Sequence, residues 1–184
     1  MEPIALQLRM AGPQDERRIW EWVNDPVMRG FAFQTRDPVP WENHRKWFAG
    51  TLEGKKRTQY VAETAEGTPA GQIRFEPNEG EPVVSVYLAE AYRGKGLASG
   101  LIRAGTERFC AERGAGAVTA WIKRENESSR RAFLKAGYGE AELLEFAGQP
   151  AWRLVWRASA GGGADAGGRR PQAENSFDFA GGEA

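Results

Sequence analysis

Apolar and polar residues alternate with two different periods along this chain. Residues 4–10 alternate between apolar and polar side chains, which is typical of a half-buried β-strand. Residues 96–113 instead repeat their apolar side chains at helical spacing, and this face consists of Ala98, Leu101, Ile102, Gly105 and Phe109. Short apolar runs bounded by turn residues, such as 83–88, predict further buried strands. The pattern therefore predicts an α/β protein built on a mixed sheet.

The same criteria give an order of elements up to residue 157. We expect helices at 13–24, 41–52, 96–113 and from Asn126 to just before Gly137, with Pro26 ending the first of them. We expect strands at 4–10, 59–63, 70–75, 83–88, 117–122, 139–146 and 151–157. Residues 30–39 are expected to form an irregular, aromatic loop. The predicted order is β-α-α-β-β-β-α-β-α-β-β within one domain, residues 1–158.

Composition limits the class of protein. The chain has 184 residues and a formal net charge of zero, which predicts one domain and argues against general binding to nucleic acid or to a membrane. No signal segment is apparent, and Cys110 is the single cysteine, so we expect a cytoplasmic protein in which Cys110 is buried rather than a nucleophile. No Cys/His cluster has metal-ligand spacing. Residues 159–184 are rich in Gly and Ala and are expected to form a disordered tail.

The segment 92–99, Tyr-Arg-Gly-Lys-Gly-Leu-Ala-Ser, combines a strand end, a glycine turn and a helix start. This arrangement binds phosphate, because backbone N–H groups and the helix dipole meet at the turn. A P-loop would need a hydroxyl residue directly after Lys95, and Gly96 stands there instead. A dinucleotide-binding loop has the pattern G-x-G-x-x-G/A. Its third small residue would be Gly or Ala, and Ser99 stands at that position instead. A glycine turn without a ligand is the structural alternative.

Two motifs in this chain resemble those of the GNAT acetyltransferases. The first is Arg-Gly-Lys-Gly-Leu-Ala at 93–98, which follows a strand ending in Val-Tyr-Leu. The second is 122–138, where a strand end precedes Asn126, a short helix, a glycine and an aromatic residue. The resemblance covers about 4–157 and implies the GNAT fold, a seven-stranded mixed sheet with splayed central strands and about four flanking helices.

The resemblance also implies how the protein binds its co-substrate, acetyl-CoA, without a metal. The backbone of the central strand is expected to pair with the pantetheine arm, the glycine loop to bind the pyrophosphate, and the second motif to line the rest of CoA. The corresponding positions here are Val86, Tyr87, Leu88, Arg93, Gly94, Lys95, Gly96, Leu97, Ala98, Asn126, Ser129 and Arg130.

Acyl transfer from a thioester requires an amine that loses its proton and a thiolate that leaves. In the family a Tyr often protonates the thiolate, but its position falls on Phe133, which leaves water or Tyr138 for this role. Tyr138 stands where the family has a core aromatic residue, which favours packing. Two candidates for the base are His44, the only histidine, and Glu76. The alternatives are that His44 packs among aromatic residues or contacts the substrate, and that Glu76 is a surface carboxylate.

The N-terminal half suggests an acceptor. Trp-x-Asn-Asp-Pro at 22–26, a downstream Arg29 and the pair His44-x-x-Trp47-Phe48 resemble amino-sugar acetyltransferases of pseudaminic-acid-type surface-glycan pathways. That resemblance implies a nucleotide-linked amino sugar as acceptor. It would be contacted by Asn24, Arg29, His44, Trp47 and Arg74, with both arginines near the diphosphate. The plainer interpretation places the aromatic residues in the core and the arginines on a solvated face.

Other functions stay open at this stage. Ribosomal-protein-type enzymes that acetylate protein N-termini have similar Trp-x-Asn-Asp-Pro starts. An aminoglycoside acceptor would favour an acidic cleft, and the acceptor half lacks a strong acidic cluster. A catalytically silent acyl-CoA-binding module would explain Phe133. A homodimer is compatible with the sequence, and no nucleic-acid or membrane partner is expected.

Overall fold

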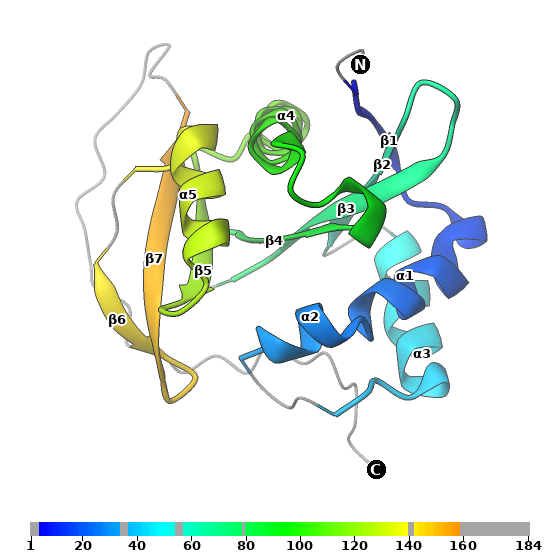
Figure 1. The fold of residues 1–184 in the computed structure, drawn as a ribbon, viewed down its shortest axis with the longest axis horizontal. Helices are drawn as coiled ribbons and strands as arrows, with labels where there is room; N and C mark the ends of the chain where they lie inside the picture. Colours follow the sequence, from blue (N-terminus) through cyan, green and yellow to red (C-terminus); the bar gives the residue numbers. More distant parts are fainter. Residues whose placement is uncertain (1–3, 34–36, 54–56, 79, 140–141, 159–184) are drawn as a thin grey trace.

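The computed structural model describes residues 4–33, 37–53, 57–78, 80–139 and 142–158, and within them seven strands form one mixed sheet (Figure 1). The strand order is β1-β2-β3-β4-β5-β7-β6. The strands are β1 (Gln7–Met10), β2 (Thr58–Glu63), β3 (Pro69–Glu76), β4 (Val83–Leu88), β5 (Ala117–Lys123), β6 (Leu143–Phe146) and β7 (Gln149–Arg157). The helices are α1 (Glu16–Val23), α2 (Pro26–Gly30), α3 (Trp41–Leu52), α4 (Leu97–Arg113) and α5 (Glu127–Ala136), with 3-10 turns η1 (Pro13–Asp15) and η2 (Glu90–Tyr92).

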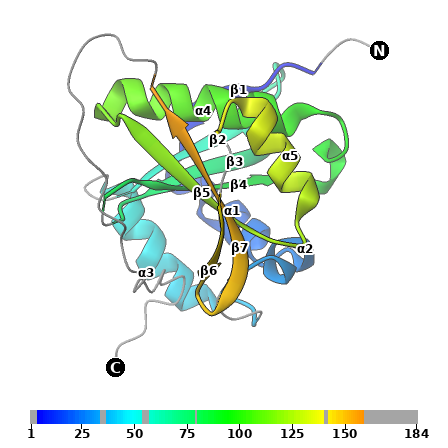
Figure 2. The same ribbon diagram turned by 90° about the vertical axis from the view of Figure 1, so that its left-hand side faces the viewer.

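The helices form a layer on each face of the sheet. α4 and α5 lie on one face, and α1, α2 and α3 lie on the other (Figures 1 and 2). Each face buries its own apolar cluster, because successive side chains of a strand point to opposite faces: Tyr60 and Ala62 pack toward α4, whereas Val61 packs with α1 and α3. The mixed α/β class and the seven-stranded sheet predicted from the sequence are confirmed.

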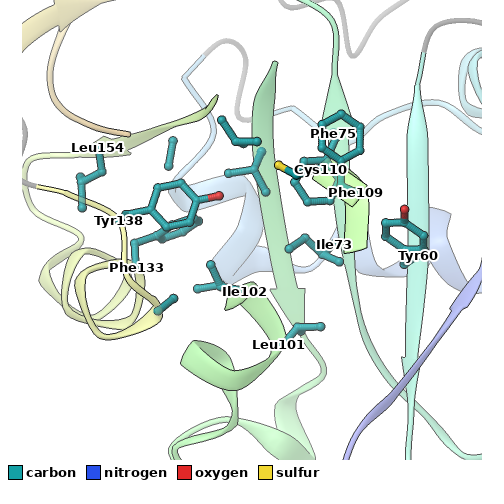
Figure 3. Close-up of a cluster of buried hydrophobic side chains, with 14 of the residues drawn as sticks. Tyr60, Ile73, Phe75, Leu101, Ile102, Phe109, Cys110, Phe133, Tyr138 and Leu154 are labelled. Carbon is teal, nitrogen blue, oxygen red and sulfur yellow. The ribbon is translucent and has the colours of Figure 1, made fainter. Parts of the chain in front are cut away.

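Close packing of α4 on the sheet fixes the helix that begins at the glycine loop (Figure 3). The rings of Phe75 and Phe109 stack with centroids 4.1 Å apart. Gly105 brings the helix backbone close to β3, since a Cβ there would lie only 2.7 Å from Ile73 Cγ2. Ile102 and Ile73 are fully buried. The N-terminus of α4 is therefore held at a defined height above the sheet.

Three elements differ from the sequence prediction. Pro26 ends α1 but also begins α2, because Asp25 caps the new helix by accepting hydrogen bonds from the N–H groups of Val27 (2.8 Å) and Met28 (3.4 Å). The chain thus has five α-helices in its described part, and the predicted loop at 30–39 begins after a helical turn. Strand β1 starts at Gln7 rather than residue 4, and β6 covers only Leu143–Phe146.

The central strands separate as predicted. Every residue of β4 pairs with β3, but β4 and β5 share a single register position, Val83 with Thr119. On the far side of the gap, β5 pairs with β7 through seven consecutive positions. The sheet therefore opens between β4 and β5 at the end where the glycine loop and the start of α5 lie.

Three further expectations concern membrane spans, metal groups and the C-terminal tail. In its described part, the chain has no helix that is both long and apolar enough to cross a membrane. The same residues contain no group of three or more His, Cys, Asp or Glu side chains placed to hold a metal ion. The tail predicted at 159–184 lies outside the described residues, so its boundary stays a prediction.

Candidate active site

A cavity of about 680 Å³ occupies the gap between β4 and β5. Its cofactor half, as we call it, is lined by Val86, the loop residues Arg93, Gly94 and Gly96, the start of α4 and the residues Asn126, Ser129 and Phe133. Its acceptor half is lined by Arg29, Phe31, Phe33, Asp37, Glu76, Trp121, Lys123 and Phe146. The cavity thus joins the glycine loop to the N-terminal layer, as an enzyme with two substrates requires.

The edge of β4 offers backbone groups to the cofactor half. Ala89 N–H donates to the Ala70 carbonyl at 2.9 Å, and hydrogen-bonded pairs alternate along an antiparallel ladder. Tyr87 is therefore bonded to β3, while the N–H and C=O groups of Val86 and Leu88 face the gap. Arg93 Nε donates to the Leu88 carbonyl at 2.8 Å. Of the predicted Val86–Leu88 segment, the backbone of Val86 is the part placed to pair with an extended ligand.

The glycine loop has the conformation that an anion site needs. Gly94 and Gly96 have φ values of +70° and +74°, in the left-handed region that favours glycine. A Cβ at either position would meet nothing within 4 Å, so the backbone there is open to a ligand. Gly96 is the N-cap of the 17-residue helix α4, whose first N–H groups and dipole attract negative charge. Lys95 is exposed and does not line the cavity; its ammonium lies 5.8 Å from the Tyr92 ring centroid.

The Arg93 side chain, which was expected to bind the CoA pyrophosphate, pairs with a carboxylate of the protein. Its Nη2 donates to Asp25 Oδ2 at 2.8 Å, and Tyr87 Oη donates to the same oxygen at 3.0 Å. Burial acts to raise the pKa of Asp25, but the hydrogen bonds from Arg93, the Val27 N–H and Tyr87 outweigh it and hold that pKa below its ordinary value. Burial and the Asp25 carboxylate raise the pKa of Tyr87 to about 12. Arg93 thus ties the glycine loop to α2.

The start of α5 contributes the second wall of the cofactor half. Asn126 caps the helix by accepting a hydrogen bond from Ser129 N–H at 3.2 Å, and both residues line the cavity. Arg130 does not line it: its guanidinium lies 4.5 Å from the Trp152 ring centroid. Arg131 and Lys135, which the sequence reasoning did not single out, do line it. Both lie on the same helix as the predicted Arg130, one and five residues further along the chain. This proximity was the signal by which sequence reasoning could have found them.

The phenol of Tyr138 lies in the core rather than in the cavity. Tyr138 is 3% exposed, its hydroxyl is 2.8 Å from Thr106 Oγ1, and its ring packs edge-on against Phe133 (Figure 3). Burial raises the pKa of Tyr138 well above its ordinary value. Phe133 does line the cavity, but it has no proton to give. Tyr138 does not line the cavity, which favours its packing role; protonation of the thiolate by water stays a prediction.

His44 lies away from the cavity, beneath α1. It is 2% exposed, and its Nε2 lies 2.9 Å from the Glu16 carbonyl, so this nitrogen donates. The ring stacks with Phe48 at 5.6 Å and with Trp41 at 5.9 Å. Burial lowers the pKa of His44 below its ordinary value of 6.5. Of the three roles considered from the sequence, the structure favours packing over proton transfer or substrate contact.

The other predicted substrate contacts that lie behind the cavity wall are Asn24, Trp47 and Arg74. Asn24 accepts from Val39 N–H at 2.7 Å and donates to the Val39 carbonyl at 3.1 Å, so it fixes the loop at 37–40. Arg74 is 3% exposed and lies over the Trp47 ring, with the guanidinium carbon 5.0 Å from its centroid. None of these three residues lines the cavity.

Charged residues do reach the acceptor half. Glu76 is 8% exposed and binds Arg57 at 3.0 Å and Arg74 at 3.2 Å, so it is not the surface carboxylate considered as an alternative. Arg29 lines the cavity as predicted and is 8% exposed. Lys123, at the end of β5, is 3% exposed, and its Nζ lies 5.8 Å from the Phe33 ring centroid. Sequence reasoning missed Lys123, although a lysine that ends an apolar strand just before Asn126 was a usable signal.

Comparison with known proteins agrees with this geometry. Residues 5–139 match the acetyltransferase (GNAT) domain family. The chain belongs to the GNAT acetyltransferase family. A relative from Bacillus subtilis (strain 168), YwnH, which carries the provisional name phosphinothricin acetyltransferase, is 32% identical over 145 residues, 76% of this chain and 87% of that protein. Mycothiol acetyltransferase of Corynebacterium aurimucosum is 32% identical over 126 residues, 66% of this chain and 37% of that protein.

Solved structures show the same fold. Spermidine N-acetyltransferase from Vibrio cholerae, solved with CoA and spermine, has a TM-score of 0.74 at 19% identity, with 83% of this chain and 95% of that chain covered. A crystal structure provisionally named phosphinothricin N-acetyltransferase has a TM-score of 0.65 at 29% identity, with coverage of 85% and 100%. This GNAT protein is accordingly an acetyl-CoA-dependent N-acetyltransferase.

The residues present fit acetyl-CoA. When bound, acetyl-CoA would supply an activated acetyl thioester. The open N–H groups around Gly94, Gly96 and the first turn of α4 would hold the pyrophosphate, and the backbone of Val86 would pair with the pantetheine arm. A backbone N–H that is fixed before reaction can also stabilise charge on a carbonyl oxygen, and the free edge of β4 supplies one at Val86.

Proposed function

We propose that this enzyme acetylates the primary amine of a small acceptor that also carries an anionic group. The observation that supports this proposal is the pair of cations in the acceptor half, Arg29 from α2 and Lys123 from β5, which are 8% and 3% exposed. Cationic side chains that line a ligand cavity attract a ligand of opposite charge. A carboxylate, phosphinate or phosphate on the acceptor would supply that charge.

The fixed charges around the acceptor half favour an anion over a polycation. Glu76 lies between Arg57 and Arg74, which more than balance its charge. Asp37 interacts electrostatically with Arg29, where burial lowers the pKa of the guanidinium and Asp37 opposes that shift. Lys123 adds a further positive charge at the same wall. Two cations and two carboxylates line the acceptor half, and Arg57 and Arg74 behind it leave an excess of positive charge among the described residues. A polyamine or an aminoglycoside is therefore disfavoured as acceptor despite the shared fold.

Two acceptor types fit the same charges. An amino acid of the phosphinothricin type carries a carboxylate and a phosphinate beside its amine, and it is favoured by the name of the Bacillus relative. A nucleotide-linked amino sugar carries a diphosphate, and it is the acceptor that the Trp-x-Asn-Asp-Pro motif at 22–26 predicts. The aromatic residues Phe33, Trp121 and Phe146 pack on one another and line the acceptor half, where they would give either ligand an apolar contact. The nucleotide sugar stays a prediction from the sequence.

Glu76 is our candidate for the group that receives the ammonium proton, directly or through water. It lies at the cavity wall, which His44 does not reach. Its two arginine partners hold the carboxylate in one place, as a proton acceptor requires.

The test is thiol release from acetyl-CoA, with product mass, across phosphinothricin, 4-amino-sugar nucleotides, spermidine, kanamycin and N-terminal peptides. Acetylation of an anionic acceptor, with the polycations inert, supports the proposal, and the acceptor that reacts decides between its two forms. Acetylated peptides would favour the protein-modifying alternative. Turnover of the polycations alone would refute the proposal, and tight CoA binding with no turnover anywhere would favour the silent binding module.

Matched variants test the two cations directly. We expect Arg29→Gln and Lys123→Gln each to raise the acceptor KM by about 10- to 100-fold, because a charge-assisted hydrogen bond contributes about 1.5–3 kcal/mol. The KM for acetyl-CoA should stay within about threefold, since neither residue lines the cofactor half. Arg103→Gln and Lys46→Gln, at exposed positions outside the cavity, are the controls. A rise in the acetyl-CoA KM alone would contradict the assignment.

A further inference from the structure

We infer that Asp25 and Arg93 form a tie that transmits acetyl-CoA binding from the glycine loop to α2, the helix that walls the acceptor half. The two oxygens of one carboxylate hold two different elements. Oδ1 caps α2 by accepting from Val27 N–H at 2.8 Å and from Met28 N–H at 3.4 Å. Oδ2 accepts from Arg93 Nη2 at 2.8 Å and from Tyr87 Oη at 3.0 Å. Asp25 is thus a positioning residue, since it acts through α2 and the loop.

Arg93 completes the connection on the cofactor side. Its Nε donates to the Leu88 carbonyl at 2.8 Å, at the end of β4, and its guanidinium carbon lies 5.1 Å from the Tyr87 ring centroid. Gly94 follows it directly in the loop that faces the cavity. Any shift of the loop toward a bound pyrophosphate therefore acts on the Arg93 side chain, and through Asp25 on the first turn of α2.

The tie fixes the N-terminus of α2, while Met28 packs on the apolar cluster beneath α1 and α3 and Arg29 is buried. The helix has only five residues, too short to be stable through its own hydrogen bonds. Val27 is 49% exposed, and Val27, Met28 and Arg29 all line the cavity. Because the helix is short and the tie holds its N-cap, a change there is expected to alter its local stability, which amide hydrogen exchange measures. Acetyl-CoA and the acceptor would then bind with positive coupling.

The distinguishing variant is Asp25→Asn. Asn is as good an N-cap as Asp, so the cap to Val27 is kept, whereas the charge that pairs with Arg93 is lost and the amide NH₂ group faces the guanidinium. Arg93→Gln removes the tie from the other side. Asp15→Asn is the control, because Asp15 also binds an arginine, Arg9, at 2.6 Å but lies outside the cavity.

The experiment uses CoA as the probe and needs no acceptor, so its outcome is independent of the proposed acceptor class. Hydrogen exchange is measured on the full chain with and without saturating CoA, and the amides of Arg29 and Phe31, which donate to Asp25 and Val27 carbonyls, report on α2. In the wild type we expect CoA to slow exchange at α2 by fivefold or more. In Asp25→Asn and Arg93→Gln, CoA should still protect the start of α4 but protect α2 by less than twofold.

The double variant sharpens the result. If the two residues act as one unit, Asp25→Asn with Arg93→Gln should lose no more protection than either single variant. Asp15→Asn should respond to CoA as the wild type does. Wild-type α2 that ignores CoA, or Asp25→Asn with undiminished protection of α2, would overturn the inference. Loss of protection that is additive in the double variant would overturn it as well.

Discussion

Substituting Gly96 by Asp tests the phosphate loop most directly. Gly96 is exposed, has φ of +74° and caps α4, and a Cβ there meets nothing within 4 Å, so the side chain itself fits. Its left-handed backbone costs a non-glycine residue about 1–2 kcal/mol, less for Asp or Asn, whose short polar side chains tolerate this region. A carboxylate at a helix N-terminus offsets part of that cost. We therefore expect the free variant to fold.

The expected loss lies in ligand binding. The new carboxylate occupies the anion site, so a phosphate about 4–5 Å away is repelled by about 3–4 kcal/mol at an effective dielectric constant of about 20. That repulsion corresponds to a loss of about 200- to 1,000-fold in CoA affinity. Calorimetric titration with CoA measures it, and higher ionic strength should recover part of the loss.

Two matched variants separate charge from shape and from backbone strain. Gly96→Asn places nearly the same volume at the site without charge, and we expect it to lose about tenfold less affinity than Gly96→Asp. Gly67→Asp makes the same change at another exposed glycine with φ of +78°, in the turn between β2 and β3 and outside the cavity. Unchanged affinity in Gly96→Asp would refute the loop assignment. An equal loss in Gly67→Asp would show that stability, rather than the site, was affected.

The remaining predictions concern protonation and packing. Burial holds the pKa of His44 below 6.5, so the unfolded chain takes up this proton first, and the contribution of His44 to stability is present above pH 6.5 and lost as pH falls below it. Urea unfolding at pH 7.5 and 5.5 should show this decline, which His44→Gln should reduce. The same variant should leave kcat unchanged, whereas Glu76→Gln should lower kcat. Gly105→Ala should destabilise the fold by about 1–3 kcal/mol, because its Cβ would lie 2.7 Å from Ile73 Cγ2. Gly100→Ala, on the same helix with nothing within 4 Å, should instead stabilise it by about 0.5–1 kcal/mol, and denaturant midpoints that rank the two variants in the opposite order would contradict the packing argument.

Features that depend on near neighbours in the chain could be predicted from the sequence. The left-handed glycines at 94 and 96, the Asn126 cap and the Gly137 helix end all follow from interactions within a few residues. The short helix α2 was missed for a local reason as well. Asp25-Pro26 is both a stop signal for one helix and a start signal for the next, and five residues show no helical period.

Features that depend on distant partners could not be predicted in this way. Arg93 pairs with Asp25, 68 residues earlier, so a cation in a phosphate loop proved to have a protein partner. His44 is bonded to the carbonyl of Glu16, 28 residues away, which only the packing of α1 on α3 determines. The family resemblance implied that β5 diverges from β4, but which side chains at the end of β5 then line the cavity, such as Lys123, depends on the packing of the whole sheet.

The single pairing position between β4 and β5 has a mechanical consequence. The sheet consists of two stiff bodies, β1–β4 and β5–β7, each held by many ladder bonds, that meet along a seam with one backbone-paired position, Val83 with Thr119. The ladders hold each part of the sheet in register, and across the seam the two parts are joined mainly by the apolar cluster beneath α4. A bulky co-substrate can therefore insert at the gap without displacing a backbone hydrogen bond of the ladder on either side.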